Sequence, residues 1–257
     1  MLDLVNIKKS YPQNLQAFDR FILKEYLQYK ILQIIFDSKY GVNLCFLGGT
    51  ALRIVHGSTR FSEDLDFDNF GLDEKDFDGL MQEIKRKLEL EGYEVEIKNV
   101  FKGAYRCYLK FPRLLKQLGL SGYEEEKILI QIDTMKQPYK YEFDKFLLNK
   151  FDVFTEINVS PPGILLSKKI CAAIGRKTLK GRDFFDIVFL ASFAKPDYEY
   201  LNGKAGVENL GQLKVKLNRV LRGKDMTKLA ADVKPFLFNP QEIKRVELFK
   251  EFISRLS

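Results

Sequence analysis

The feature that most constrains this chain is the stretch 47–67, where an apolar run ends in Gly48 and Gly49 and an Asp-Leu-Asp triplet follows. Glycines allow the backbone to turn tightly and to bring its N–H groups against an anion such as a phosphate. Successive side chains of a strand alternate between its faces, so Asp64 and Asp66 would point the same way. Two adjacent carboxylates repel each other unless a cation lies between them, and oxygen ligands of this kind suit Mg²⁺. The stretch therefore predicts a site for a nucleoside triphosphate and a divalent metal.

Four further side chains of this stretch are candidates for contact with the triphosphate: Thr50, Arg53, Arg60 and Ser62. The arginines can hold phosphate oxygens through paired N–H groups, although arginines are also common near surface turns. Ser62 can hydrogen-bond a phosphate, accept a nucleotide or phosphate group itself, or serve only as a polar residue where a strand begins. The competing interpretation of the stretch is a glycine turn followed by an ordinary strand with two surface acids. The length of the pattern favours the nucleotide site.

The composition is that of a globular protein with a basic surface. Of its 257 residues 46% are hydrophobic, so the chain can bury the core of one large domain or two modest ones. The net charge of +7 favours a polyanionic partner such as RNA. Three scattered cysteines and one histidine support neither a zinc cluster nor a disulfide framework. The first residues are too polar for a signal peptide and no run approaches about 18 apolar residues, so we expect a cytoplasmic protein without membrane spans.

Apolar periodicity and turn signals predict that helices and strands alternate in the first part of the chain. In the strand that ends at Asp133, isoleucines fill one face and the acid lies on the other. The predicted helices cover 15–36, 50–55 and 73–90, and the predicted strands cover 43–47, 63–67, 93–100, 104–111 and 127–133.

The remainder of the chain is predicted to be helical, and Pro161 and Pro162 mark its start. We therefore expect one domain over residues 1–158 and a helical bundle over residues 159–257. The helices of the bundle are predicted over 164–176, 181–190, 207–220, 226–238 and 242–256.

Charged residues gather on the first two helices of this bundle. Lys169 and Arg176 are seven residues apart, so they share a helix face. Asp183 lies three residues and Arg182 four residues before Asp186, which groups these side chains as well. These charges can belong to a binding site or to a salt-bridge network that joins two helices, since charged pairs at helical spacing are common without any chemistry.

The glycine pair and the Asp-Leu-Asp triplet resemble the first motif of the DNA polymerase beta type nucleotidyltransferases. The fuller strings Gly-Gly-Thr-Ala-Leu-Arg and Arg-Phe-Ser-Glu-Asp-Leu-Asp-Phe are more narrowly similar to the AbiEii-type toxins. The later order of Lys169, Arg176 and the Arg-Asp-x-x-Asp segment 182–186 carries the second half of this resemblance, which spans residues 46–190. It implies an α/β (α+β) fold, in which a polymerase beta-like nucleotidyltransferase domain with a mixed sheet precedes the helical bundle and the active site lies in the groove between them.

The resemblance implies roles for the candidate residues. Asp64, Asp66 and Asp133 would hold two Mg²⁺ ions, for which Mn²⁺ is the alternative. Lys169 would contact the triphosphate or the acceptor, and Asp183 or Asp186 would orient this lysine or act as a base. The nucleotide would be bound by Gly48, Gly49, Thr50, Arg53, Ser62, Arg176 and Arg182.

The expected reaction is attack of an acceptor hydroxyl on the α-phosphate of a nucleoside triphosphate, with release of pyrophosphate. Family likeness and positive charge together favour the 3′ end of a tRNA as the acceptor. The protein would then be the toxin of a toxin–antitoxin or phage-defence pair, with a cognate antitoxin as a partner. Two alternatives stay open. One is an enzyme that modifies a protein side chain or a small molecule, and the other is a nucleotide-binding regulatory module without turnover.

Overall fold

The computed structural model describes residues 3–256, so Met1, Leu2 and Ser257, the ends of the two predicted domains, lie outside the described residues. The chain forms two compact units. The first comprises residues up to 56 together with residues 61–159, and the second comprises residues 57–60 together with those from 160 onward. The sequence placed one boundary after residue 158, whereas the structure also assigns a short segment before the acids to the second unit.

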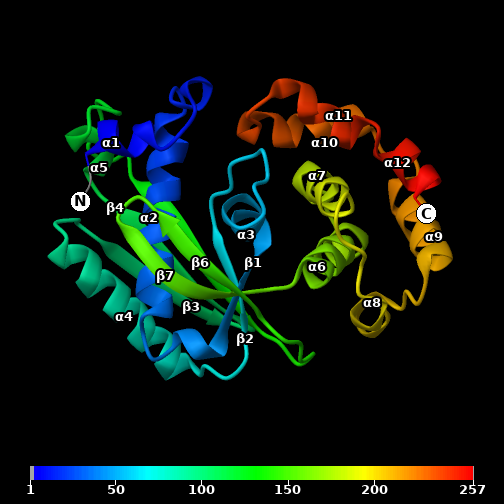
Figure 1. The fold of residues 1–257 in the computed structure, drawn as a ribbon, viewed down its shortest axis with the longest axis horizontal. Coiled ribbons are helices and arrows are strands. Elements are labelled where there is room, and N and C mark those ends of the chain that lie inside the picture. The colour runs from blue at the N-terminus through cyan, green and yellow to red at the C-terminus, as the bar shows by residue number, and fades with distance from the viewer. Residues whose placement is uncertain (1–2, 257) are drawn as a thin grey trace. The chain divides into compact units, whose positions relative to one another are not determined.

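A seven-stranded mixed sheet forms the centre of the first unit, in the order β3-β4-β5-β2-β1-β7-β6 (Figure 1). β2 runs parallel to β5 and antiparallel to β1, while β1 runs parallel to β7. The pairs β3–β4, β4–β5 and β6–β7 are antiparallel, so the predicted mixed sheet is confirmed. The strands are β1 (Leu44–Leu47), β2 (Leu65–Asn69), β3 (Glu96–Lys102), β4 (Ala104–Phe111), β5 (Ile128–Lys136), β6 (Asp144–Lys150) and β7 (Val153–Val159).

Two long helices, α2 (Asp19–Phe36) and α4 (Glu74–Leu90), pack against each other and against one face of this sheet (Figure 1). α2 contacts β7 and β5, and α4 contacts β3 and β4. The three isoleucines of β5 are almost completely buried on this side, so Gln131 and Asp133, which alternate with them, lie on the other face. The first unit also contains α1 (Leu4–Lys9), α3 (Gly48–Ile54), α5 (Leu114–Gln117) and 3₁₀ turns at Gln13–Leu15 and Gly41–Asn43.

Helix α2, which the sequence predicted over residues 15–36, is buried nearly all round. Its polar residues Glu25, Gln28 and Lys30 are buried as well. Each has a partner, as buried polar groups require: Glu25 accepts a hydrogen bond from Tyr11, Gln28 donates to the backbone carbonyl of Ser62, and Lys30 forms an ion pair with Glu91. None of the described helices is long and apolar enough to span a membrane.

The second unit is built from short helices, as the sequence predicted, but with more breaks. Pro235 and Pro240 lack the N–H that a helix interior needs and interrupt the region 226–256. The helices are α6 (Pro162–Gly175), α7 (Gly181–Leu190), α8 (Tyr198–Ala205), α9 (Leu210–Leu221), α10 (Met226–Val233), α11 (Lys244–Glu247) and α12 (Phe249–Arg255), with 3₁₀ turns at Lys234–Phe236 and Pro240–Ile243.

Candidate functional site

The glycine turn packs directly against one of the two acids. β1 ends at Leu47, and Gly48 begins α3 with a φ of +83°, a conformation that L side chains rarely adopt. A Cβ atom at Gly48 would lie 2.0 Å from Oδ2 of Asp66, which is far too close. Only glycine allows both the turn and the position of this carboxylate, so the turn and the acid form one structural feature.

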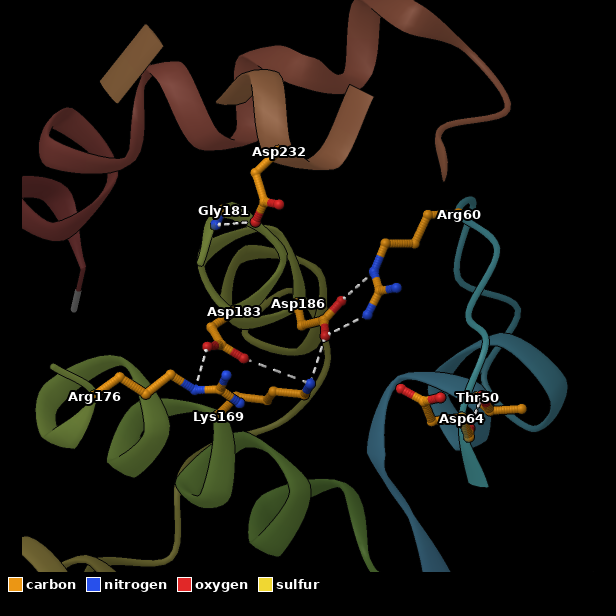
Figure 2. A network of polar contacts seen from close by, with 9 residues as sticks. All are labelled: Thr50, Arg60, Asp64, Lys169, Arg176, Gly181, Asp183, Asp186 and Asp232. Atoms are coloured by element: carbon orange, nitrogen blue, oxygen red, sulfur yellow. Dashed lines mark hydrogen bonds and ion pairs between the residues drawn. The ribbon is translucent and has the colours of Figure 1, made fainter. Parts of the chain in front are cut away.

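The strand register brings the third candidate acid beside Asp66. β2 and β5 are parallel neighbours, and Asp66 pairs with Asp133. Asp64 directly precedes β2, and its backbone carbonyl accepts a hydrogen bond of 2.5 Å from the Thr50 hydroxyl (Figure 2). The residue after the glycine pair therefore fixes the backbone of the first acid.

Asp133 has partners that the sequence did not indicate. Arg106 Nε lies 2.5 Å from its Oδ1, and Gln131 Nε2 lies 2.6 Å from its Oδ2. Both partners lie on the same face of the sheet, because Arg106 is the register partner of Asp133 on β4 and Gln131 precedes it by two residues. Within the described residues, no three carboxylate, thiol or imidazole groups form a cluster that could hold a metal ion. The three-acid metal site therefore stays a prediction.

The donor chemistry at this place suits a hard divalent cation. Asp64 and Asp66 are half-buried carboxylates two residues apart, and oxygen donors of this kind are what Mg²⁺ prefers. No side chain at position 48 comes between the turn and the Asp66 carboxylate, because Gly48 leaves no room there for a Cβ. These two carboxylates are thus of the donor type that a divalent ion takes.

A cavity of about 460 Å³ opens beside the first acid. Asp64 and Glu63 line it from the segment before β2, and Lys24 of α2 forms an ion pair of 2.9 Å with Glu63. Phe21 and Leu129 contribute apolar surface. The cavity combines apolar walls with a few charged groups, which is typical of pockets for small ligands.

The other predicted nucleotide-binding residues of the first unit are engaged within the protein. Thr50 is 1% exposed, and Gly49 is buried in the first turn of α3. Arg53 donates to Glu25, with 2.9 Å between Nε and Oε2. Burial raises the pKa of Glu25, but the charges of Arg53 and Lys150 outweigh this effect and hold its pKa below the usual value.

Ser62 remains half-buried, and its backbone carbonyl accepts a hydrogen bond from Gln28 of α2. This contact fixes the backbone of the segment that leads to Asp64.

In the second unit, α6 and α7 bring together the charged residues that the sequence singled out (Figure 2). Lys169 Nζ lies 2.8 Å from Oδ2 of Asp186 and 3.8 Å from Oδ1 of Asp183. Arg176, just past the end of α6, places its Nε 3.0 Å from Oδ2 of Asp183. Both acids are buried and would be costly to leave unpaired. The two cations supply the opposite charge that these acids need.

Arg60, a candidate for contact with the triphosphate, also belongs to this cluster. It is 2% exposed and donates through Nε and Nη2 to the two carboxylate oxygens of Asp186, at 2.8 and 2.7 Å (Figure 2). Segment 57–60 has two further anchors in the second unit: Thr59 Oγ1 lies 2.5 Å from Glu242 Oε2, and the N–H of Phe238 donates to the carbonyl of Thr59. The segment between α3 and β2 is thus held by residues that come more than a hundred positions later.

The electrostatics of Asp186 follow from these contacts. Complete burial alone would raise its pKa, but the Arg60 guanidinium and the Lys169 ammonium together lower the pKa below its usual value. Asp186 is therefore an ionised acid with two cationic partners.

The start of α7 is fixed by a close contact with α10. The N–H of Gly181 donates to Oδ2 of Asp232 at 3.0 Å, and a Cβ at Gly181 would lie only 1.8 Å from the carbonyl oxygen of Leu229 (Figure 2). The guanidinium of Arg182 lies 4.9 Å from the centre of the Phe236 ring.

Comparisons with known proteins place this chain in a family. The family of nucleotidyl transferase AbiEii toxins, of type IV toxin–antitoxin systems, matches residues 30–242. Among solved structures, the chain is similar to JHP933 from Helicobacter pylori, with 20% identity, 91% of each chain covered and a TM-score of 0.53. It is also similar to a candidate nucleotidyltransferase from H. pylori, with 19% identity, 90% of this chain and 93% of that chain covered, and a TM-score of 0.54. At these identities the two structures show a shared fold, and no curated protein matches the chain.

Proposed function

The chain belongs to the AbiEii family of nucleotidyltransferase toxins, and from this premise we propose that it transfers a nucleoside monophosphate from a triphosphate to an acceptor hydroxyl. The 3′ end of a tRNA is the proposed acceptor. The hydroxyl attacks the α-phosphate, the bond between the α-phosphate and the bridging oxygen breaks, and pyrophosphate leaves.

The observation that carries this proposal is the packing of Gly48 against the Asp66 carboxylate. A turn that admits only glycine, held against an acid, is difficult to explain as an ordinary surface strand. The register partner Asp133 and the preceding Asp64 support the same assignment, because the register sets acids of the adjacent strands β2 and β5 beside each other. We propose Gly48 and Gly49 as the phosphate-binding backbone, with Thr50 positioning Asp64.

Nucleotidyltransferases of this superfamily generally use divalent metal ions. We propose that Asp64, Asp66 and Asp133 hold Mg²⁺, or Mn²⁺ in its place. A bound ion of this kind neutralises charge on the triphosphate and activates the attacking hydroxyl. Asp133 forms an ion pair with Arg106 in the structure, so it would have to give up this partner in order to bind a metal ion.

We propose that the charged cluster of the second unit helps to bind the triphosphate or the acceptor. Lys169 would contact the triphosphate or the acceptor, and its ion pairs with Asp183 and Asp186 support an oriented ammonium group. Arg176 and Arg182 are the proposed additional phosphate ligands. The alternative, a network that only joins α6 and α7, is separable by experiment: Lys169→Arg keeps a cation beside Asp183 and Asp186, so the urea midpoint of unfolding should change little, while transfer should fall at least 100-fold because the shape of the cation changes.

The family supports two kinds of partner besides the nucleotide. An antitoxin follows from the toxin–antitoxin class of the matching family. An RNA acceptor is supported by the net charge of +7, since phosphate chains bind basic proteins through release of counterions.

The test is a transfer assay with the purified protein, Mg²⁺, each labelled nucleoside triphosphate in turn and total cellular RNA. We expect label on tRNA, and we expect Asp66→Asn to reduce it at least 1,000-fold because the substitution removes a charge without changing the size of the side chain. Glu74→Gln, an exposed acid on α4, is the matched control and should retain full activity.

Other outcomes distinguish the alternatives. Label on a protein or a small molecule would identify a different acceptor, and triphosphate binding without transfer in any fraction would identify a regulatory module. Either result would contradict the tRNA assignment.

A further inference from the structure

The face of β3, β4 and β5 that lies opposite α2 and α4 carries three lysines. Cys107 and Leu109 of β4 are completely buried on the helix side, so the alternating Lys110 lies on the open side. Lys98 and Lys102 of β3 take the same side, because Lys98 pairs with Tyr108 and Lys102 with Ala104 across the β3–β4 ladder. Lys98 and Lys102 are exposed, and Lys110 is half-buried. We call these three residues the open-face lysines.

Among the described residues, the open-face lysines have no acidic partner. The acids of this face already hold other cations: Glu96 pairs with Lys127 at 2.9 Å, and Asp133 pairs with Arg106 at 2.5 Å. Glu96 is also the register partner of Lys110, but its ion pair is with Lys127, so Lys98 and Lys102 carry most of the positive charge that remains to attract anions on this face.

The register places these lysines in line with the candidate active site. Tyr108 pairs with Gln131 across the β4–β5 ladder, and Asp66 of β2 follows on the next strand beside Asp133. Neighbouring strands are about 4.8 Å apart, so β4 and β3 lie about 10 and 14 Å from β2. These distances correspond to a few nucleotides of single-stranded chain.

The cavity beside Asp64 lies where β5 begins, and residues of α2 line it together with residues of β5. Leu129, which contributes to its wall, is the register partner of Lys110, and Lys127 also lines it. Its apolar surface and the adjacent carboxylate suit a nucleoside whose hydroxyl faces the acid.

We infer that this face binds the acceptor as a single-stranded RNA end, with the terminal nucleoside in the cavity beside Asp64 and the preceding phosphates on the open-face lysines. The inference rests on the proposed function and adds the location and the chemistry of the acceptor. Tyr108, which lies between Lys98 and Gln131 on the same face, offers a ring for base stacking.

The lysines could instead serve to prevent the edge of the sheet from pairing with another molecule, but this role explains only part of the arrangement. β3 is an edge strand of the sheet, and lysines on edge strands discourage pairing between molecules. Lys110, however, lies on β4, which has partners on both sides, and it needs no such protection.

The experiment measures binding of 5′-fluorescein-labelled bulk tRNA to the full chain without nucleotide. The variant is Lys98→Gln/Lys102→Gln/Lys110→Gln, and the control Lys39→Gln/Lys75→Gln/Arg86→Gln removes the same charge from exposed residues on or beside α2 and α4. We expect the open-face variant to bind about 10- to 50-fold more weakly at 150 mM salt, and its slope of log K against log salt to fall by about 2, at about 0.7 per lost phosphate contact. The control should stay within about twofold of the wild type.

Three results would overturn the inference. Equal weakening in both variants would mean that only net charge matters, and unchanged RNA affinity with increased light scattering would assign the lysines to edge protection. Label on an acidic protein that is lost only in the open-face variant would assign the face to a protein acceptor. The proposed function is judged separately: if the wild type labels no RNA, the reaction fails whatever the lysines bind, whereas labelling with unaltered affinity in the open-face variant refutes only the location.

Discussion

Gly48 is the residue at which the turn and the acid depend on each other. In Gly48→Ala the new Cβ would overlap Oδ2 of Asp66, so the carboxylate must move by about an ångström or more. A displacement of this size costs about 100-fold in rate when it affects a reacting geometry, and we expect at least that loss of transfer. The measurement is the initial rate of RNA labelling together with the urea midpoint of unfolding.

Gly57 provides the matched control for this prediction. Its φ of +72° is also left-handed, but a Cβ there would meet nothing within 4 Å. Gly57→Ala should therefore lose only about 1 kcal/mol of stability through backbone strain and keep its activity. Equal loss of activity in both variants would show that Gly48 matters for its backbone conformation alone.

Asp186 should make the stability of the protein sensitive to acid. Its folded pKa is held below its usual value, and the unfolded pKa is about 3.9. The pairing with Arg60 and Lys169 therefore stabilises the fold at pH above about 4, and this contribution is lost as the pH falls through the lower folded pKa. Asp186→Asn should be about 3 kcal/mol less stable at pH 7, because two buried cations lose their partner charge.

The pH profile separates this effect from simple loss of packing. Urea unfolding at pH 7, 5, 4 and 3 should show that Asp186→Asn loses less additional stability between pH 5 and 3 than the wild type does. Parallel profiles for the two proteins would contradict the assigned role of the carboxylate.

The sequence revealed those candidate residues whose chemistry is local. Gly48, Asp64 and Asp66 lie within 20 positions and form a recognisable spacing. The partner of Arg60 was not predictable, because Asp186 lies 126 residues away and an arginine near a phosphate site has the same local surroundings. Arg106 likewise becomes a partner of Asp133 only through the register of two strands.

At the scale of elements, prediction succeeded where the apolar pattern is regular. β4 covers its predicted residues, and the alternation of β5 is found in the structure. β6 was not predicted, because Leu147 is 52% exposed and interrupts the expected alternation between buried and polar positions. α8 was missed because Gly203 lies within it and Gly206 ends it in a left-handed conformation, which makes the segment resemble a loop.

Helix α7 depends on its first residue for its contact with α10. Gly181→Ala would bring a Cβ to 1.8 Å from the Leu229 carbonyl oxygen, so α7 and α10 must separate or one must shift. We expect a loss of about 3 kcal/mol and a fall in Tm of about 6–10 °C for a chain of this length. The measurement is a thermal melt followed by circular dichroism.

Gly175, the last residue of α6, is the control for that substitution. A Cβ there would meet nothing within 4 Å, and alanine favours a helix more than glycine does. Gly175→Ala should leave Tm unchanged or raise it by 1–3 °C, at about 0.5–1 kcal/mol. A comparable fall in both variants would refute the close contact at Gly181.

At the scale of the whole molecule, the chain passes between its two units three times, after residues 56, 60 and 159. The proline pair near residue 161 signals the last of these transitions, because prolines leave a local mark in the sequence. The first two leave none, since segment 57–60 differs from an ordinary connection between α3 and β2 only through partners that come much later in the chain.

This organisation predicts resistance to a protease at an unusual place. The bond after Arg60 lies in a connection, where trypsin usually cuts, yet the side chain is buried and paired. We expect no cleavage there in the intact protein and rapid cleavage in Asp186→Ala, identified by mass spectrometry of the fragments. Asp183→Ala, which removes an acid that pairs with Lys169 and Arg176 but not with Arg60, should stay resistant. Cleavage in both variants would indicate general loosening of the second unit.

The position of Arg60 also has a consequence for synthesis on the ribosome. Chains grow by about 5–20 residues per second, so the 126 positions between Arg60 and Asp186 correspond to about 6–25 s of elongation. During that interval the strand that carries Asp66 has already been made. Arg60, in the connection that leads to this strand, still lacks the carboxylate of Asp186. A nascent chain can therefore fix the connection that leads to Asp64 and Asp66 only after residue 186 has been translated.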